Sequence, residues 1–208
     1  MNIETIRPMD IEKRSFSIIR ETLGNRTFPP EQEPVILRAI HTSADFDYAD
    51  NLYFSPGAVE QFQQALSSGA DIVTDTKMAK AGISQPALSR LGGQVHCFIS
   101  DEDVAKEAKE RQVTRAIVSM EKACAINKPL IFAIGNAPTA LLRLIELAQE
   151  GKIQPAGIIG VPVGFVNVVE SKELLIQSRL PSIVARGRKG GSNIAAAVCN
   201  ALLYQLTR

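Results

Sequence analysis

Short runs of β-branched and apolar residues alternate with longer helical patterns from about Asp71 onward. This alternation is typical of strand and helix units that build a parallel sheet covered by helices. Between the runs, apolar residues recur at three- and four-residue spacing, as from Leu141 to Ala148, which indicates amphipathic helices. The pattern predicts an α/β core over residues 71–208. Its five expected strands are Asp71–Thr74, Val95–Ile99, Leu130–Ile134, Gly157–Val161 and Ser182–Ala185.

The first seventy residues have a helical pattern without strands. One helix is expected from Asp10 to Leu23, with Asp10 as its cap, and a second from Glu31 to about Thr42. A third should begin with Ser55 as its cap and end at Gly69. No repeat or flexible linker interrupts the chain. We therefore expect one domain over residues 1–208, in which residues 1–70 form a helical flap on the α/β core.

Composition narrows the class of protein. The chain has 208 residues, of which 45% are hydrophobic and 22% charged, and no apolar run approaches the ~18 residues that cross a bilayer. The net charge is +1, Trp is absent and aromatic residues make up 5%, so neither nucleic acid nor a membrane is an expected partner. The three cysteines are widely spaced, and no secretory leader pattern is visible. We expect a reduced, cytoplasmic protein without structural zinc.

Candidate binding residues follow the predicted strands, because ligands of open parallel sheets bind at the carboxyl ends of the strands. The last of these loops, residues 186–192, combines glycines with Arg186, Arg188 and Lys189 and ends at Ser192, which could begin a helix. These are the ingredients of an anion-binding loop, although a solvated basic turn fits the residues equally well. Neither GxGxxG nor GxxxxGK[ST] occurs, so no nucleotide cofactor is expected and a dinucleotide-dependent oxidoreductase is disfavoured.

A second loop, residues 135–139, brings Asn136 and Thr139 to the start of a helix. Both side chains could hold a carboxylate there. Capping of the helix alone explains these residue types as well, and from the residues alone it is the favoured interpretation.

His41 and His96 are the two candidates for imidazole acid–base chemistry. His96 lies within a predicted buried strand, where a hydrogen-bonded core histidine is favoured. His41 ends a helix and begins a polar segment, so a catalytic role and a capping or surface role both remain open. No GxSxG motif supports a hydrolase. The spacing of Asp45, Asp47, Asp71 and Asp75 fits no metal motif, so we expect solvated or capping carboxylates and no metal site.

Six segments, taken together and in order, resemble the precorrin-8X methylmutase family, which includes the cobalt-precorrin-8 methylmutases. The resemblance covers nearly the whole chain. The segments are residues 14–16 (RSF), 38–46 (RAIHTSADF), 75–78 (DTKM), 135–140 (GNAPTA), 160–166 with 170–172 (GVPVGFV and ESK), and 186–192 (RGRKGGS).

The resemblance implies a three-layer α/β/α sandwich with a flavodoxin-like parallel sheet, and an isomerase. The reaction of the family is migration of a methyl group from carbon 11 to carbon 12 of a precorrin-8 macrocycle, which gives cobyrinic or hydrogenobyrinic acid in cobalamin biosynthesis. No cofactor is required. The resemblance further implies that His41 is the acid/base, that Ser15, Arg38 and Arg115 contact the substrate, and that the protein is a homodimer with the helical N-terminal region near a shared site. Because no residue pattern of the chain fits a metal site, any cobalt is expected to arrive with the substrate.

Binding of a tetrapyrrole would explain the polar residues of these loops together. Its carboxylates could pair with the cations Arg38, Arg186, Arg188 and Lys189 and accept hydrogen bonds from Asn136, Thr139 and Ser192. The face of the macrocycle could be covered by Phe46, Tyr48 and Phe165, which could equally be core residues. Cys97 and Cys199 lie in apolar patterns and are not expected to be nucleophiles. The alternative function is a non-catalytic tetrapyrrole carrier, and neighbouring enzymes of the pathway are possible partners.

Overall fold

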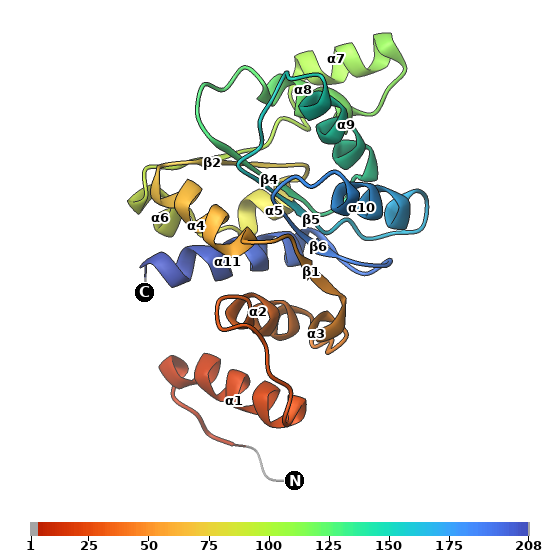
Figure 1. The fold of residues 1–208 in the computed structure, drawn as a ribbon. Helices are drawn as coiled ribbons and strands as arrows, with labels where there is room; N and C mark the ends of the chain where they lie inside the picture. The colour runs from red at the N-terminus through yellow and green to blue at the C-terminus, as the bar shows by residue number, and fades with distance from the viewer. Residues whose placement is uncertain (1–3, 208) are drawn as a thin grey trace.

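A central six-stranded sheet organises the computed structural model, which describes residues 4–207 (Figure 1). The strand order across the sheet is β1-β6-β5-β4-β2-β3. The strands are β1 (Leu52–Phe54), β2 (Asp71–Thr74), β3 (Val95–His96), β4 (Leu130–Ile134), β5 (Gly157–Gly160) and β6 (Ser182–Ala185).

The predicted run of strands is present, but the sheet is neither five-stranded nor purely parallel. Strands β3, β2, β4, β5 and β6 pair in parallel, as expected. The missed strand is β1, which pairs antiparallel with β6 so that Leu52 lies opposite Ala185. A three-residue strand carries almost no periodic signal of its own, and its partner lies far away in the sequence. The prediction of a five-stranded sheet was therefore wrong in strand number, and the strand that it missed pairs antiparallel.

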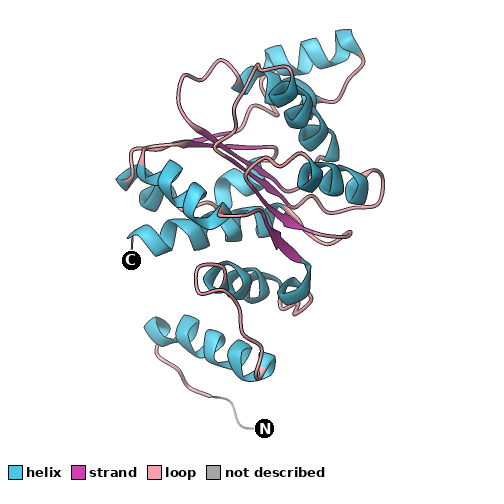
Figure 2. Ribbon diagram, viewed as in Figure 1, coloured by secondary structure: helices cyan, strands magenta, loops and turns pink. Residues whose placement is uncertain are grey.

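Helices cover both faces of the sheet (Figure 2). On one face α11 packs against α2, α4, α5 and α6, and on the other α9 packs against α8 and α10, with α7 on α8. Two separate clusters of buried apolar side chains correspond to these faces. The helices of residues 4–207 are α1 (Ile11–Leu23), α2 (Glu33–Ser43), α3 (Tyr48–Asn51), α4 (Ala58–Ser67), α5 (Lys77–Gly82), α6 (Gln85–Arg90), α7 (Glu102–Arg111), α8 (Arg115–Ala123), α9 (Pro138–Gln149), α10 (Val168–Gln177) and α11 (Ser192–Thr207), with a 3-10 turn at Pro8–Asp10.

The N-terminal helices lie outside the layer that α11 forms. Helix α2 packs on α11, and α1 packs in turn on α2, at the lower edge of the molecule in Figure 1. Both helices fall close to their predicted bounds, and Gly24 ends α1 as expected. None of the helices in residues 4–207 combines the length and apolar character that crossing a membrane requires.

The cap of α4 differs from the prediction. Helix α4 begins after Gly57, whose φ of +67° favours glycine, and Ser55 makes no side-chain cap. The Ser55 hydroxyl instead accepts a hydrogen bond from the Ser182 backbone nitrogen at 2.9 Å, next to the β1–β6 pair. A serine suited to begin a helix is used here to join two distant segments.

Candidate functional site

The loop after β4 is held in place by a buried carboxylate. Asp75, 2% exposed at the end of β2, accepts hydrogen bonds from the backbone nitrogens of Gly135, Asn136 and Ala137 at 3.0, 2.8 and 2.7 Å. Burial raises the pKa of Asp75, and the three backbone donors oppose that rise. The loop carrying Asn136 and Thr139 therefore has a fixed backbone.

A cavity of about 500 Å³ lies at this edge of the sheet, where the carboxyl ends of β2 and β4 meet. Three predicted binding residues line it: Arg115, Asn136 and Thr139. The Thr139 hydroxyl lies 2.9 Å from that of Thr114, which caps α8. The structure thus brings together predicted binding residues from two segments that are separate in the sequence, 114–115 and 136–139.

Ser192 joins the same edge through a hydroxyl contact. Its Oγ lies 2.7 Å from Oγ1 of Thr76, which lines the cavity and caps α5. Gly135 allows the close approach of these loops, since a Cβ at this position would lie 2.6 Å from the Cα of Ser192. The first turn of α11 is therefore packed directly against the loop after β4.

The glycine-rich loop of residues 186–191 is packed against the loop after β5. A Cβ on Gly190, whose φ is +158°, would lie 2.1 Å from the Val161 carbonyl oxygen, so only glycine fits. The same carbonyl accepts a hydrogen bond from the Gly191 nitrogen at 2.9 Å. The backbone of this loop is therefore fixed by its packing against the loop after β5.

The three cations of this loop have different surroundings. Arg186 donates two hydrogen bonds, of 3.0 and 2.8 Å, to the Glu173 carboxylate of α10. Lys189 lies 2.6 Å from the carboxylates of both Asp45 and Asp47, and these neighbours raise its pKa. Arg188 is exposed, and its guanidinium lies 5.3 Å from the centre of the Phe165 ring. Arg186 and Lys189 are thus engaged within the chain.

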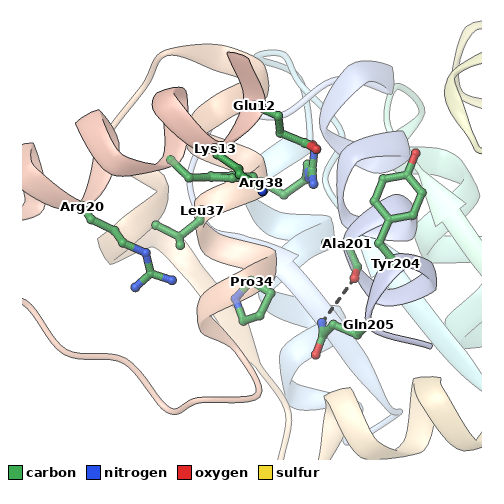
Figure 3. Close-up of a pocket in the computed structure, with 10 residues that line it drawn as sticks. Glu12, Lys13, Arg20, Pro34, Leu37, Arg38, Ala201, Tyr204 and Gln205 are labelled. Carbon is green, nitrogen blue, oxygen red and sulfur yellow. Dashed lines mark hydrogen bonds and ion pairs between the residues drawn. The ribbon is translucent and has the colours of Figure 1, made fainter. Parts of the chain in front are cut away.

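Arg38 lies in a second cavity, of about 350 Å³, between α1, α2 and α11 (Figure 3). Its guanidinium pairs with Glu12 of α1 and lies over the rings of Phe16 and Tyr204, at 4.9 and 5.3 Å from their centres. Figure 3 shows the Arg38 and Glu12 side chains meeting across the two helices. Arg38 therefore ties α1 to the rest of the fold.

His41 and Ser15 belong to the same helical pair. The imidazole of His41 is exposed at the end of α2 and lies 5.2 Å from the Phe16 ring of α1. Ser15 is partly buried on α1, and its hydroxyl donates to the Ile11 carbonyl at 2.9 Å. Asp45, four residues beyond His41, connects this region to the glycine-rich loop through Lys189.

The other candidate residues, His96, Asp71 and Asp75, have structural partners. His96 is hydrogen bonded as expected, with Nε2 2.8 Å from Asp71, which also pairs with Lys128 at 2.5 Å. Of the two expected roles, solvated or capping, Asp71 and Asp75 are not solvated because both are buried, and Asp75 caps the turn after β4. Among residues 4–207, no group of three or more His, Cys, Asp or Glu side chains is arranged to hold a metal ion.

The aromatic residues divide between core and surface. Tyr48 is buried, which raises the pKa of its phenol to about 12, and Phe46 packs against the core. Phe165 is 79% exposed beside Val166, which is equally exposed. Of the three, Phe165 is therefore the one available to a ligand. Cys199 is buried, which raises the pKa of its thiol to about 12 and agrees with a role in packing.

Three residues that shape these loops were not predicted as site residues, although each lies in a segment that carries the family resemblance. They are Asp75, Thr76 and Lys172, and the last is an α10 lysine that is completely buried. Lys172 lies between Ser171 and Glu173 in the sequence, so its local pattern gives no sign that the side chain is buried. Their importance becomes visible only when the loops are packed together.

Comparison with known proteins gives the same family for the sequence and for the fold. The precorrin-8X methylmutase family model matches residues 10–205. A cobalt-precorrin-8 methylmutase of Salmonella typhimurium is 47% identical over 96% of both chains, and one of Priestia megaterium is 46% identical over 95% of this chain and 88% of the relative. A solved precorrin-8X methylmutase of Thermus thermophilus superimposes with a TM-score of 0.85 at 37% identity, covering 94% of this chain and 96% of that one.

The α/β fold and the matched sequence define an isomerase of the methylmutase class. The chain belongs to the precorrin-8X methylmutase family.

Proposed function

We propose that this methylmutase converts cobalt-precorrin-8 to cobyrinic acid with His41 as its acid/base. The family assignment carries the reaction class: a methyl group moves from carbon 11 to carbon 12 of a precorrin-8 macrocycle in cobalamin biosynthesis. The substrate with cobalt is favoured because the Salmonella and Priestia relatives are both named cobalt-precorrin-8 methylmutase. The metal-free macrocycle is the alternative substrate. Where cobalt is present, it belongs to the substrate.

The reaction is balanced within one molecule. The bond from carbon 11 to the methyl carbon breaks while the bond from carbon 12 to that carbon forms, and the π-electrons of the ring system shift to compensate. No leaving group is released and no external methyl donor enters. The enzyme must therefore hold one conformation of the macrocycle and adjust its electron distribution. Protonation or hydrogen bonding of the ring system by His41 would supply the second effect.

His41 is suited to this role by its accessibility. Its ring is exposed at the end of α2, and Phe16 lies beside it at 5.2 Å. Arg38 lies one helical turn earlier, and Ser15 lies on the helix that packs against α2. We propose that Ser15 and Arg38 bind the substrate near the reacting ring.

The carboxylates of the macrocycle would bind at the edge of the sheet where the carboxyl ends of β2 and β4 meet. Arg115, Asn136 and Thr139 share one cavity there, and Ser192 contacts Thr76 at its wall. Helix starts offer backbone N–H groups and a favourable dipole to an anion at the same edge. In the glycine-rich loop, Arg186, Arg188 and Lys189 add positive charge, and Phe165 could cover an apolar face of the ring.

The assembly and setting of the protein are further parts of the proposal. We propose a cytoplasmic homodimer in which the α1 region lies near a shared site, because Met9, Ile11 and Ile18 expose large apolar side chains there. The parallel strand order β3-β2-β4-β5-β6 supports a flavodoxin-like arrangement, with residues 1–70 and 71–208 forming one domain. Neighbouring enzymes of cobalamin biosynthesis remain proposed partners.

The test compares the wild-type chain with His41→Ala, using His96→Ala as a matched control. Affinity for the corrin product, cobyrinic acid, is measured by spectral titration, and turnover of the precorrin substrate is measured separately. We expect His41→Ala to retain affinity and lose turnover roughly 100- to 10,000-fold, the usual range for a positioned acid/base. His96→Ala should turn over normally, since its ring is bound to Asp71. Catalysed turnover that is equal in His41→Ala and wild type would exclude His41 as the acid/base, whereas binding by a wild type that does not accelerate the reaction would favour the carrier alternative.

A further inference from the structure

Lys172 lies beneath the glycine-rich loop and is completely buried. This lysine of α10 is 0% exposed, and its ammonium donates to the carbonyl oxygens of Gly187 and Lys189, both at 2.8 Å. These two carbonyls flank Arg188. Between them, the Arg188 carbonyl accepts a hydrogen bond from the Gly164 nitrogen at 3.2 Å. Three successive carbonyl groups of the loop thus accept hydrogen bonds from Lys172 and Gly164.

The charge of Lys172 is not balanced by a carboxylate in the described chain. No ion pair of residues 4–207 includes it, and its two hydrogen bonds both go to neutral carbonyl groups. Burial alone lowers the pKa of Lys172 to about 8. A buried, unpaired ammonium is costly compared with an apolar side chain of similar volume. Packing alone therefore does not explain why a lysine occupies this position.

Arg188 is the loop cation that has no carboxylate partner within residues 4–207. Arg186 is held by Glu173, and Lys189 is held by two aspartates. Arg188 is exposed, and its guanidinium lies over the ring of Phe165. Its guanidinium is therefore available to pair with a carboxylate from outside the chain.

We infer that Lys172 is a positioning residue for Arg188: it fixes the backbone on both sides of Arg188 so that the guanidinium faces a carboxylate of the bound macrocycle. This inference rests on the proposed function, because it takes the tetrapyrrole as the ligand. A fixed backbone lowers the entropy that Arg188 loses on binding. Lys172 itself does not touch the ligand, so its effect should depend entirely on Arg188.

A double-mutant cycle on affinity for cobyrinic acid tests this dependence. The variants are Lys172→Met, Arg188→Gln and the double variant, each titrated in solution as the full chain. We expect each single change to weaken affinity roughly 10- to 100-fold, the range for a charge-assisted hydrogen bond. The double variant should bind no more weakly than Arg188→Gln, because the two residues form one functional unit. In turnover, Lys172→Met should raise KM and leave kcat nearly unchanged.

Lys128→Met is the matched control. Lys128 also donates to a backbone carbonyl, that of Gly92 at 3.1 Å, and it pairs with Asp71 far from the glycine-rich loop. The Lys128→Met variant should bind cobyrinic acid with wild-type affinity. Losses that add in the double variant, or wild-type affinity in Lys172→Met, would overturn the positioning role of Lys172.

A second variant covers the case in which Lys172→Met does not fold. Gly187 has a φ of +75°, which a β-branched residue does not adopt, whereas a Cβ there meets no atom within 4 Å. Gly187→Val should therefore displace the carbonyl that Lys172 holds without a steric clash, and its loss of affinity should again not add to that of Arg188→Gln. If the wild-type chain itself does not bind cobyrinic acid, the proposed function fails and the inference fails with it. Binding by the wild type with additive losses contradicts the inference alone.

Discussion

The carboxylate of Asp75 lies 2.8 Å from the backbone nitrogen of Asn136, beneath the turn that follows β4. The two residues follow adjacent parallel strands, β2 and β4, whose carboxyl ends meet at one edge of the sheet. Because Asp75 also binds the nitrogens of Gly135 and Ala137, one buried side chain determines the shape of the whole turn. The cavity that holds Asn136 and Thr139 depends on this contact.

Asp75→Asn should destabilise the fold and weaken binding together. The amide has the size of the carboxylate, but its NH₂ group would face backbone N–H donors and leave one of them unsatisfied. We expect the free energy of unfolding to fall by about 2 kcal/mol, within the range for a lost charged hydrogen bond. Urea denaturation measures the stability, and titration with cobyrinic acid measures the binding. Asp50→Asn, at an exposed aspartate, is the control, and equal stability of the two variants would contradict the role of Asp75.

Neutralising the glycine-rich loop should weaken tetrapyrrole binding and flatten its dependence on salt. The triple change of Arg186, Arg188 and Lys189 to glutamine removes the positive charge that attracts the carboxylates, and salt screens such attraction. Arg188→Gln alone should produce most of the effect, since Arg186 and Lys189 already pair with acidic residues. Titrations at low and high ionic strength measure both quantities. Unchanged affinity in the triple variant would remove this loop from the binding site.

The stability of the wild-type chain should increase with pH relative to Lys172→Met. The pKa of Lys172 is about 8 in the folded protein, against a usual value of 10.5. Below pH 8 both states are protonated, so folding bears the full cost of burying the charge. Between these pKa values only the unfolded state binds the proton, so the free energy of unfolding rises with pH. The gain should reach about 3 kcal/mol, because each pKa unit corresponds to about 1.4 kcal/mol.

The measurement is urea denaturation of both proteins from pH 7 to pH 10.5. The difference between them isolates Lys172, because all other titrating groups are shared. A difference that stays constant across this range would mean that the Lys172 amine keeps an ordinary pKa.

Cysteine chemistry should play no part in turnover. Cys199 is buried in α11, and burial raises the pKa of its thiol to about 12, so no thiolate forms near neutral pH. Cys199→Ala and Cys97→Ala should each retain wild-type kcat, measured on protein whose folding is checked by thermal denaturation. Cys199→Ser should lower stability by about 1–3 kcal/mol, because it buries a hydroxyl without a partner. Loss of turnover in a stable alanine variant would refute this prediction.

Local sequence features predicted most of the regular structure. The strands Asp71–Thr74, Leu130–Ile134 and Ser182–Ala185 have the predicted bounds, because continuous apolar runs mark buried parallel strands. Helix α1 ends at Gly24 as expected, because a glycine in this conformation ends a helix without the steric cost of a side chain. Six short motifs predicted the family, and the match of the family model to residues 10–205 confirms this prediction.

Only the tertiary structure revealed what depends on pairing between distant segments. The strand Leu52–Phe54 forms because β6, more than 120 residues later, offers it backbone partners, and Ser55 loses its predicted capping role to Ser182 for the same reason. Likewise, the hydrogen bonds by which Asp75 and Lys172 fix two loops join segments that are distant in sequence, so only the folded structure shows them. Helices, strands and turns depend on residues that are close in sequence and can be predicted from it. The partner of a buried charge depends on which distant segments pack together, and only the tertiary structure determines that.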